Sequence, residues 1–204
     1  MSKYIKLANS LTDSWNKCDY RDLKESLVVD AQKSLMKFKR INNKEYKDNY
    51  IQVIDLFCGA GGTSLGFAAI NEILPVFKFL GGCDINAVSA STYSYNFDTP
   101  LLNDNVVEFA YSHEKLNKTL ERIGYDKNKP LILIGCAGFS SHRKKDWDKK
   151  DDSRNSLIIA FSKIVEEINP DVILMENVPE FLSDKYWEYF SAAKQNFERA
   201  GYLV

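Results

Sequence analysis

A glycine-rich turn between an apolar run and a helical pattern constrains this chain more than any other stretch. An apolar run that contains Asp55 ends at Phe57, and three glycines follow within the four residues 59–62. Glycine allows a sharp turn and close approach by a ligand, because it carries no Cβ. The amides at the start of the next helix would face that ligand with the positive end of the helix dipole. The stretch predicts a strand, a tight turn and a helix, either as a cofactor loop or as a plain βα connection.

A second apolar run ends in an acidic residue, and its spacing from the glycine-rich turn is typical of nucleotide-binding folds. Residues 76–83 are mostly apolar and lead into Asp84, which lies about twenty residues beyond the glycines. An acid at the tip of the second strand suits hydrogen bonding to ribose hydroxyls. The turn and the acid together indicate an adenosine-containing cofactor.

Strand and helix patterns alternate from Ile51 onward, which is typical of a parallel, doubly wound α/β sheet. In such sheets, ligands bind beyond the carboxyl ends of the strands. The predicted strands are 51–57, 76–82, 131–135 and 171–175, with a short one near 101–102, and the predicted helices are 63–70, 87–95, 112–123, 155–168 and 185–199. The residues at the strand ends are Asp55, Asp84, Asp104, Cys136 and Glu176.

Composition divides the chain into two regions. The 204 residues are 45% hydrophobic, which is enough for one domain core, and we assign that domain to residues 51–204. Residues 1–50 are an extension and charged linker, with a predicted helix at 21–40 that either packs on the domain or contacts a partner. This extension holds 11 Lys and Arg against 7 Asp and Glu, a net of +4, while the whole chain is −1. Whole-chain charge therefore neither supports nor excludes a nucleic-acid partner.

The cysteines and the hydropathy pattern indicate a cytoplasmic protein without a metal site or a membrane span. The four cysteines lie at positions 18, 58, 83 and 136, and their spacing is not that of metal ligands. We read Cys58 and Cys83 as packing residues. No apolar run approaches the length of about 18 residues that a membrane helix needs, and we see no secretory signal.

Cys136 and Glu176 are the candidate reactive groups. A thiol at a strand tip beside glycines can lie near backbone amides that favour the thiolate, although a lone cysteine is more often a small buried hydrophobe. A carboxylate that leaves an apolar strand is partly desolvated, so we expect the pKa of Glu176 to rise toward a value useful for proton donation. The alternative for Glu176 is an ordinary capping or salt-bridged acid.

These segments, in this order, resemble the motifs of the DNA (cytosine-5) methyltransferase family from about residue 51 to residue 204. Residues 55–62 resemble the first motif, which binds S-adenosylmethionine, 84–86 the second, and Asp104 the acid of the third. Residues 135–140 resemble the nucleophile loop, and 152–157 and 176–178 are similar to the fifth and sixth motifs. The resemblance implies a Rossmann-like S-adenosylmethionine-dependent methyltransferase fold. It also implies cofactor contacts at Asp55, Phe57, Gly59, Ala60, Gly61, Gly62, Asp84, Ile85, Asp104, Asn105 and Leu157, and catalytic roles for Cys136, Glu176, Asn177 and Arg154.

The same resemblance implies a covalent mechanism on double-stranded DNA. Cys136 would attack C6 of a cytosine flipped out of the duplex, and Glu176 would contact N3 and the exocyclic amine, so that C5 can take the methyl group. Phe57 would stack on the cofactor adenine, Asp84 would bind the ribose and Asp104 the adenine amine. Residues 141–152 match a loop that closes over DNA, or else form a solvated charged loop.

The chain departs from the family pattern at the nucleophile and at its end. Gly135 and Ala137 stand where the family has proline and glutamine, and a glycine there would position the thiol less tightly. The chain ends at Val204, before the arginine-rich motif and the target-recognition domain, so we expect an incomplete fold. Our preferred interpretation is the catalytic subunit of a split enzyme, with a second polypeptide supplying the rest. The alternatives are a decayed or non-catalytic subunit for assembly or DNA binding, and a tRNA methyltransferase.

Overall fold

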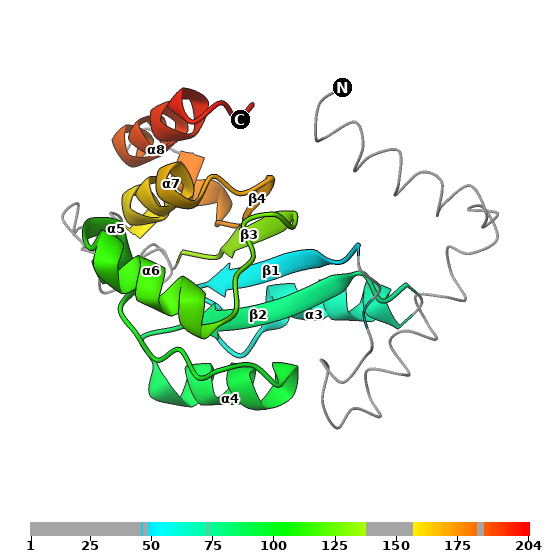
Figure 1. Cartoon of the computed structure of the whole chain (residues 1–204). Coiled ribbons are helices and arrows are strands. Elements are labelled where there is room, and N and C mark those ends of the chain that lie inside the picture. Colours follow the sequence, from blue (N-terminus) through cyan, green and yellow to red (C-terminus); the bar gives the residue numbers. More distant parts are fainter. Residues whose placement is uncertain (1–45, 47–48, 73, 138–156, 183–185) are drawn as a thin grey trace.

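The computed structural model describes residues 46, 49–72, 74–137, 157–182 and 186–204 (Figure 1). Within these ranges, four parallel strands form one sheet in the order β2-β1-β3-β4. The parallel pairing and the flanking helices confirm the predicted α/β fold. The strands are β1 (Ile51–Leu56), β2 (Phe77–Cys83), β3 (Leu131–Gly135) and β4 (Val172–Met175).

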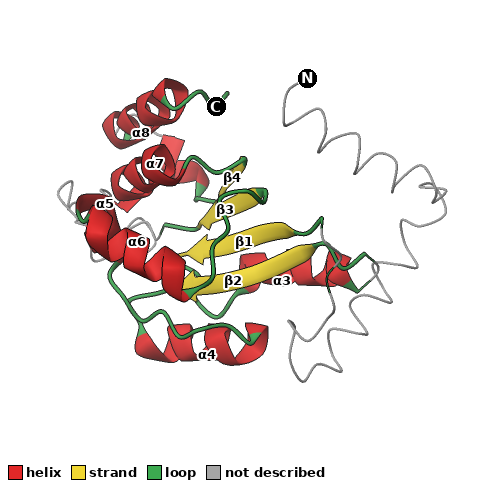
Figure 2. Ribbon diagram, viewed as in Figure 1, coloured by secondary structure: helices red, strands yellow, loops and turns green. Residues whose placement is uncertain are grey.

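Helices cover both faces of this sheet (Figure 2). One face packs against α3 (Gly62–Asn71) and α4 (Ala87–Phe97), and the other against α5 (Val106–Tyr111), α6 (His113–Arg122), α7 (Leu157–Ile168) and α8 (Trp187–Arg199). A short 3-10 helix, η3 (Pro179–Leu182), follows β4. All six residues of β1 are buried, as expected for a central parallel strand covered on two sides. No helix of the described residues is long and apolar enough to cross a membrane.

The order in which the chain adds strands to the sheet reverses at β1, and this reversal indicates where a ligand would bind. From β1 the chain crosses to β2 on one side, and it then returns past β1 to β3 and β4 on the other side. Ligands of doubly wound sheets bind at such a reversal, outside the carboxyl ends of the strands. The pairing of β1 with β2 is irregular: Val53 pairs with Phe79 and Ile54 with Gly81, so Leu80 has no partner in β1.

Polar caps fix the starts of three helices along the carboxyl edge of the sheet. Asn86 accepts hydrogen bonds from two amides of α4, Asn105 accepts one in α5, and Ser112 accepts one in α6. Such side chains satisfy amides that lack partners in the first turn of a helix.

The sequence-based boundaries need modest corrections. The first strand ends at Leu56, because Phe57 adopts a left-handed φ of 61° and begins the turn. The short strand expected near 101–102 is a single bridge between Leu102 and Cys83. Helix α5 and the 3-10 turn η3 were not expected. The predicted helix at 21–40 lies outside the described residues.

Candidate active site

The glycine-rich loop after β1 is shaped by its packing against α4. Gly61 has φ 99°, and a Cβ there would lie 2.3 Å from Cε2 of Phe97, so only glycine fits. A Cβ on Gly59 or Gly62 would meet no atom within 4 Å, which leaves the outer side of the loop open. The loop therefore presents bare backbone at the start of α3, as a phosphate- or nucleoside-type ligand requires.

Asp84 ties the end of β2 to this loop. Its Oδ2 accepts a hydrogen bond from the Gly59 amide at 2.9 Å, and its Oδ1 accepts one from the Asn86 amide at 2.8 Å. A carboxylate has about four acceptor positions, so Asp84 can still accept from ligand hydroxyls. The amide of Cys58 also donates to the carbonyl of Cys83 at 3.1 Å. Loop and strand end are thus held at a fixed spacing.

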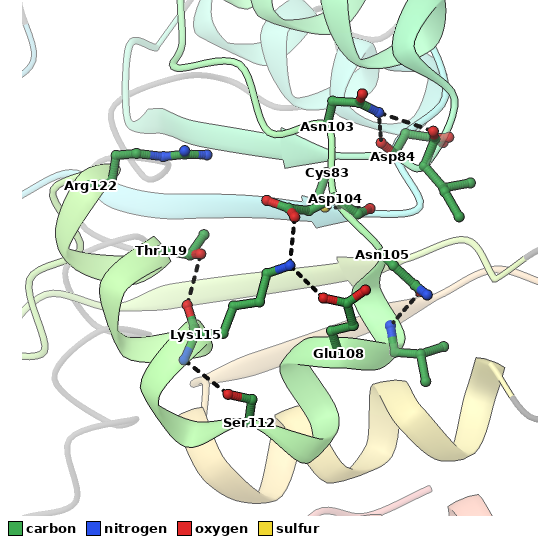
Figure 3. A network of polar contacts seen from close by, with 12 residues as sticks. Cys83, Asp84, Asn103, Asp104, Asn105, Glu108, Ser112, Lys115, Thr119 and Arg122 are labelled. Atoms are coloured by element: carbon green, nitrogen blue, oxygen red, sulfur yellow. Dashed lines mark hydrogen bonds and ion pairs between the residues drawn. The ribbon is translucent and has the colours of Figure 1, made fainter.

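A lysine that sequence reasoning did not single out holds Asp104. Figure 3 shows Lys115 of α6 between Asp104 and Glu108, with its Nζ 2.7 Å from a carboxylate oxygen of each. Hydrogen bonds to Asp104 and then to Glu108 raise the pKa of Lys115. Asn103 in turn donates to the carbonyls of Asp84 and Ile85 at 3.0 Å each. The sequence could not reveal the Lys115 contact, because the pair is brought together only by the folded helix.

Asp55 carries a buried carboxylate beneath the loop. Ser64 donates to its Oδ2 at 2.6 Å, while Oδ1 has no hydrogen-bond partner among the described residues. Burial raises the pKa of Asp55 to about 6, with a smaller contribution from Asp84, and the Ser64 hydrogen bond opposes the rise. A buried acid with a free oxygen suits a cationic ligand.

Cys136 and Glu176 meet at the ends of β3 and β4. The Cys136 thiol donates to Oε2 of Glu176 at 2.7 Å. The backbone supports this contact, because the Cys136 amide donates to Leu56 and the Glu176 amide donates to Gly135. Two residues forty positions apart in the sequence are therefore adjacent, as their strand-end positions predicted.

The chemical state of this pair differs from the expectations. Burial, followed by the Glu176 hydrogen bond and charge, raises the pKa of Cys136 to about 12. The expected thiolate-favouring setting is thus wrong for this arrangement, since the carboxylate stabilises the thiol as its donor. The expected desolvation of Glu176 is also wrong, because its side chain is exposed.

Packing explains the glycine that precedes the thiol. A Cβ on Gly135 would lie 2.5 Å from Cε2 and 2.7 Å from Cζ of Phe161, a buried ring on α7. Asn177 spans the same corner: its Nδ2 donates to the carbonyl of Ala137 at 3.4 Å, and its Oδ1 accepts from the Val178 amide at 2.8 Å. These contacts therefore hold the backbone just after Cys136 from the β4 side.

The other predicted site residues make fewer contacts that bear on a ligand site. Phe57 is half-buried, whereas Ala60 and Ile85 are exposed. The Asn105 side chain caps α5, and Leu157 is the first residue of α7. Arg154 and the loop 141–152 lie outside the described residues. Cys58 and Cys83 are buried free cysteines, which confirms their interpretation as packing residues.

The site thus gathers a buried acid, an open glycine loop and two further acids at one end, and a thiol–carboxylate pair at the other. Asp55 lies near the carboxyl end of β1, Asp104 follows the bridge between Leu102 and the end of β2, and the other groups follow the carboxyl ends of strands in the same sheet. The first group can hold a ligand with a nucleoside and a positive charge, and the second can deliver a sulfur nucleophile and a proton.

Comparison with known proteins gives a consistent result. Residues 51–204 match the family described as C-5 cytosine-specific DNA methylase. The chain is similar to the Type II methylase M.HgiDII of Herpetosiphon aurantiacus, with 35% identity over 74% of this chain and 40% of that protein. It is similar to the Type II methyltransferase M1.BsuMI of Bacillus subtilis, with 32% identity over 83% of this chain and 40% of that protein. The chain thus spans about 40% of the length of these relatives.

Proposed function

Because the chain belongs to the C-5 cytosine-specific DNA methylase family, we propose that it transfers a methyl group from S-adenosylmethionine to C5 of cytosine in DNA. The observation that carries this proposal is the 2.7 Å contact between Cys136 Sγ and Glu176 Oε2. Attack on C6 needs a sulfur nucleophile, and the ring becomes electrophilic only when N3 gains a proton. One thiol–carboxylate pair can serve both needs.

The proton follows the electron flow through this pair. As a lone pair of Cys136 Sγ forms the bond to C6, the thiol proton passes to Glu176, and Glu176 gives a proton to N3 of the base. The electrons of the C5–C6 double bond then become available at C5. The high pKa of the resting thiol fits this order, because the sulfur loses its proton only as the base arrives.

Bound S-adenosylmethionine supplies an electrophilic methyl group for C5. The C5 proton then leaves to water as the C6–S bond breaks, and the N3 proton returns through Glu176 to sulfur. After one turnover the site holds the same single thiol proton as before. The pair therefore returns to the hydrogen-bonded state seen in the structure.

The residues present suit the proposed cofactor. Asp55 has an unpartnered buried oxygen, and the loop is open where Gly59 and Gly62 lack side chains. Asp84 would bind the ribose, and Asp104, held by Lys115, would accept from the adenine amine. The other proposed cofactor contacts are Phe57, Ala60, Gly61, Ile85, Asn105 and Leu157. The other proposed catalytic residues are Asn177 and Arg154.

We propose double-stranded DNA with a flipped cytosine as the substrate, and a second polypeptide as a partner that adds recognition. A base in a duplex must be extruded before a thiol can reach C6. The outer edge of β4 supports the partner, since it pairs with no strand among the described residues. Val172 and Leu174 on this strand are 45% and 37% exposed. An apolar unpaired edge favours the addition of another strand.

Covalent trapping tests the proposal. The chain is incubated with S-adenosylmethionine and duplex DNA containing 5-fluorocytosine, then run on a denaturing gel, with 5-fluorocytosine tRNA as a parallel arm. Because fluorine at C5 cannot leave as a proton does, a competent enzyme stays attached through Cys136. We expect a shifted band with DNA that is lost in Cys136→Ala and strongly reduced in Glu176→Gln.

Each outcome of this assay has a meaning. A band that forms only after the candidate second polypeptide is added supports the two-chain enzyme. A band with tRNA instead of DNA moves the substrate to RNA. The absence of a band with either nucleic acid, with and without the second polypeptide, would contradict the proposed activity and favour a non-catalytic subunit.

A further inference from the structure

A buried chain of three polar side chains lies beneath the glycine-rich loop. Tyr93 of α4 is fully buried, and its hydroxyl lies 3.0 Å from Oγ of Ser64. Ser64 is also fully buried and donates to Oδ2 of Asp55 at 2.6 Å. A hydroxyl has one proton, and Ser64 gives it to Asp55, so Tyr93 must be the donor to Ser64. Both donors therefore point toward the carboxylate.

The position of Tyr93 is fixed by the same packing that shapes the loop. Its ring stacks on Phe97 with centroids 4.3 Å apart and an interplanar angle of 19°. A Cβ on Gly82 of β2 would lie 2.6 Å from the Tyr93 ring, and a Cβ on Gly61 of the loop would lie 3.1 Å from it. Tyr93 fills the space beside both glycines. It therefore cannot shift without moving the loop or the strand.

Among the described residues, no positively charged side chain balances the Asp55 carboxylate. The titratable groups that face it are Asp84 after β2, Cys58 in the loop, Tyr93 on α4 and Cys136 after β3. Helix α3, which carries Ser64, has no titratable residue in its sequence. No described basic side chain forms an ion pair with Asp55. Within the described part of the chain, its charge is thus stabilised by the Ser64 hydrogen bond and not by an ion pair.

We propose that Tyr93 and Ser64 are positioning residues for the cofactor, which keep Asp55 ionised beneath the loop so that its charge attracts the sulfonium of S-adenosylmethionine. A carboxylate in a poorly solvated site attracts a nearby cation more strongly than a solvent-exposed one does. This inference rests on the proposed function, because it concerns the same cofactor site. Its consequence is that cofactor affinity depends on pH through a three-residue chain of which two members touch no ligand.

The pH profile separates this role from simple packing. Burial raises the pKa of Asp55 to about 6, and the Ser64 hydrogen bond opposes that rise. Affinity for the cation should fall as pH drops through this range and Asp55 gains a proton. Loss of the Ser64 hydroxyl removes the opposing hydrogen bond, so the midpoint should move to higher pH. Loss of a hydroxyl that only packs would lower stability without moving the midpoint.

The test is calorimetric binding of S-adenosylmethionine to the full chain between pH 5 and 8.5. For wild type we expect the Kd to rise about tenfold from pH 7.5 to pH 5, as a single group near pKa 6 dictates. The midpoint should rise by about one unit in Ser64→Ala and by about half a unit in Tyr93→Phe, in line with one lost hydrogen bond. Asp55→Asn should bind weakly with a flat profile. S-Adenosylhomocysteine, which lacks the sulfonium charge, should show a smaller pH dependence.

Ser162→Ala is the matched control, because Ser162 is a fully buried serine on α7 that bonds to Ile159 and Asn196 instead. It should lose stability but keep the wild-type midpoint. Should Ser64→Ala fail to fold, Tyr93→Phe decides the question alone. An unchanged midpoint in a folded Tyr93→Phe, or a flat wild-type profile, would overturn the inference while leaving the proposed function intact. Failure of wild type to bind at any pH would overturn both.

Discussion

Replacing Gly135 by alanine tests whether this position is dictated by packing. An added Cβ would lie 2.5 to 2.8 Å from three ring atoms of Phe161, far inside normal contact. The ring is 1% exposed and packs edge-on against Phe197, with centroids 6.1 Å apart. It therefore has little room to move, and overpacking of this kind costs about 1–3 kcal/mol. The proline that the family has here would introduce a Cβ at the same place.

The assay is equilibrium unfolding in urea, followed by far-ultraviolet circular dichroism. Gly66→Ala is the matched control, because Gly66 lies within α3 and a Cβ there meets nothing within 4 Å. The same chemical change should stabilise the protein by about 0.5–1 kcal/mol at Gly66 and destabilise it at Gly135. For a chain of this size, each kcal/mol corresponds to roughly 2–4 °C in Tm.

A double variant shows whether Phe161 is the cause. Phe161→Leu alone should destabilise by leaving a cavity, but it makes room for the new methyl group, so Gly135→Ala should cost less in its presence. The alanine should also displace Cys136 from Glu176, and so slow covalent trapping. If Gly135→Ala proves as stable as wild type, the reasoning from this contact is refuted.

Three further predictions concern charge. Glu176→Gln should lower the pKa of Cys136, because it removes the acceptor charge, and should speed alkylation of that cysteine by iodoacetamide at pH 8, measured by peptide mass spectrometry; unchanged alkylation would contradict the contact. Lys115→Met should weaken S-adenosylmethionine binding a few-fold in calorimetry, as expected for a partly exposed ion pair, whereas Lys118→Met, in an exposed pair, should not. Burial raises the pKa of Asp55 from 3.8 to about 6, so the folded state keeps a proton that the unfolded chain loses. The free energy of unfolding of ligand-free wild type, relative to Asp55→Asn, should therefore fall by about 2 kcal/mol from pH 4 to pH 7 in urea titrations, and a difference that does not vary with pH would exclude this shift.

The sheet could be predicted from sequence because each strand is a short apolar run bounded by turn residues. The sequence alone also predicts the glycine loop. It predicts that Cys136 and Glu176 lie close together, since parallel strands bring their carboxyl ends to one edge. Helix α5 was missed because its six residues are too few to establish a helical period.

Other features depend on distances that only the fold sets. Lys115 forms an ion pair with Asp104, which lies eleven positions earlier in the sequence. The sequence around either residue does not predict this ion pair. The resting state of Cys136 does not follow from the local sequence, because its partner is a carboxylate forty positions away and not the neighbouring amides. The family resemblance predicts that Gly135 positions the thiol less tightly than proline would, whereas the structure shows a position closed by Phe161.

The irregular pairing of β2 marks the point where this strand can change its length. Phe79 faces α3 and α4, the next two residues, Leu80 and Gly81, both face the opposite helices, and Gly82 faces α4 again. Because the residues after the irregularity already pair with β1 on their own faces, removal of Leu80 or Gly81 would restore regular pairing and leave every later side chain on its face. A single-residue deletion at this point should therefore be tolerated in the course of evolution more often than a deletion elsewhere in β2, which would turn side chains to the wrong face. The kink is thus the place in β2 where the spacing between the glycine turn and Asp84 can vary by one residue.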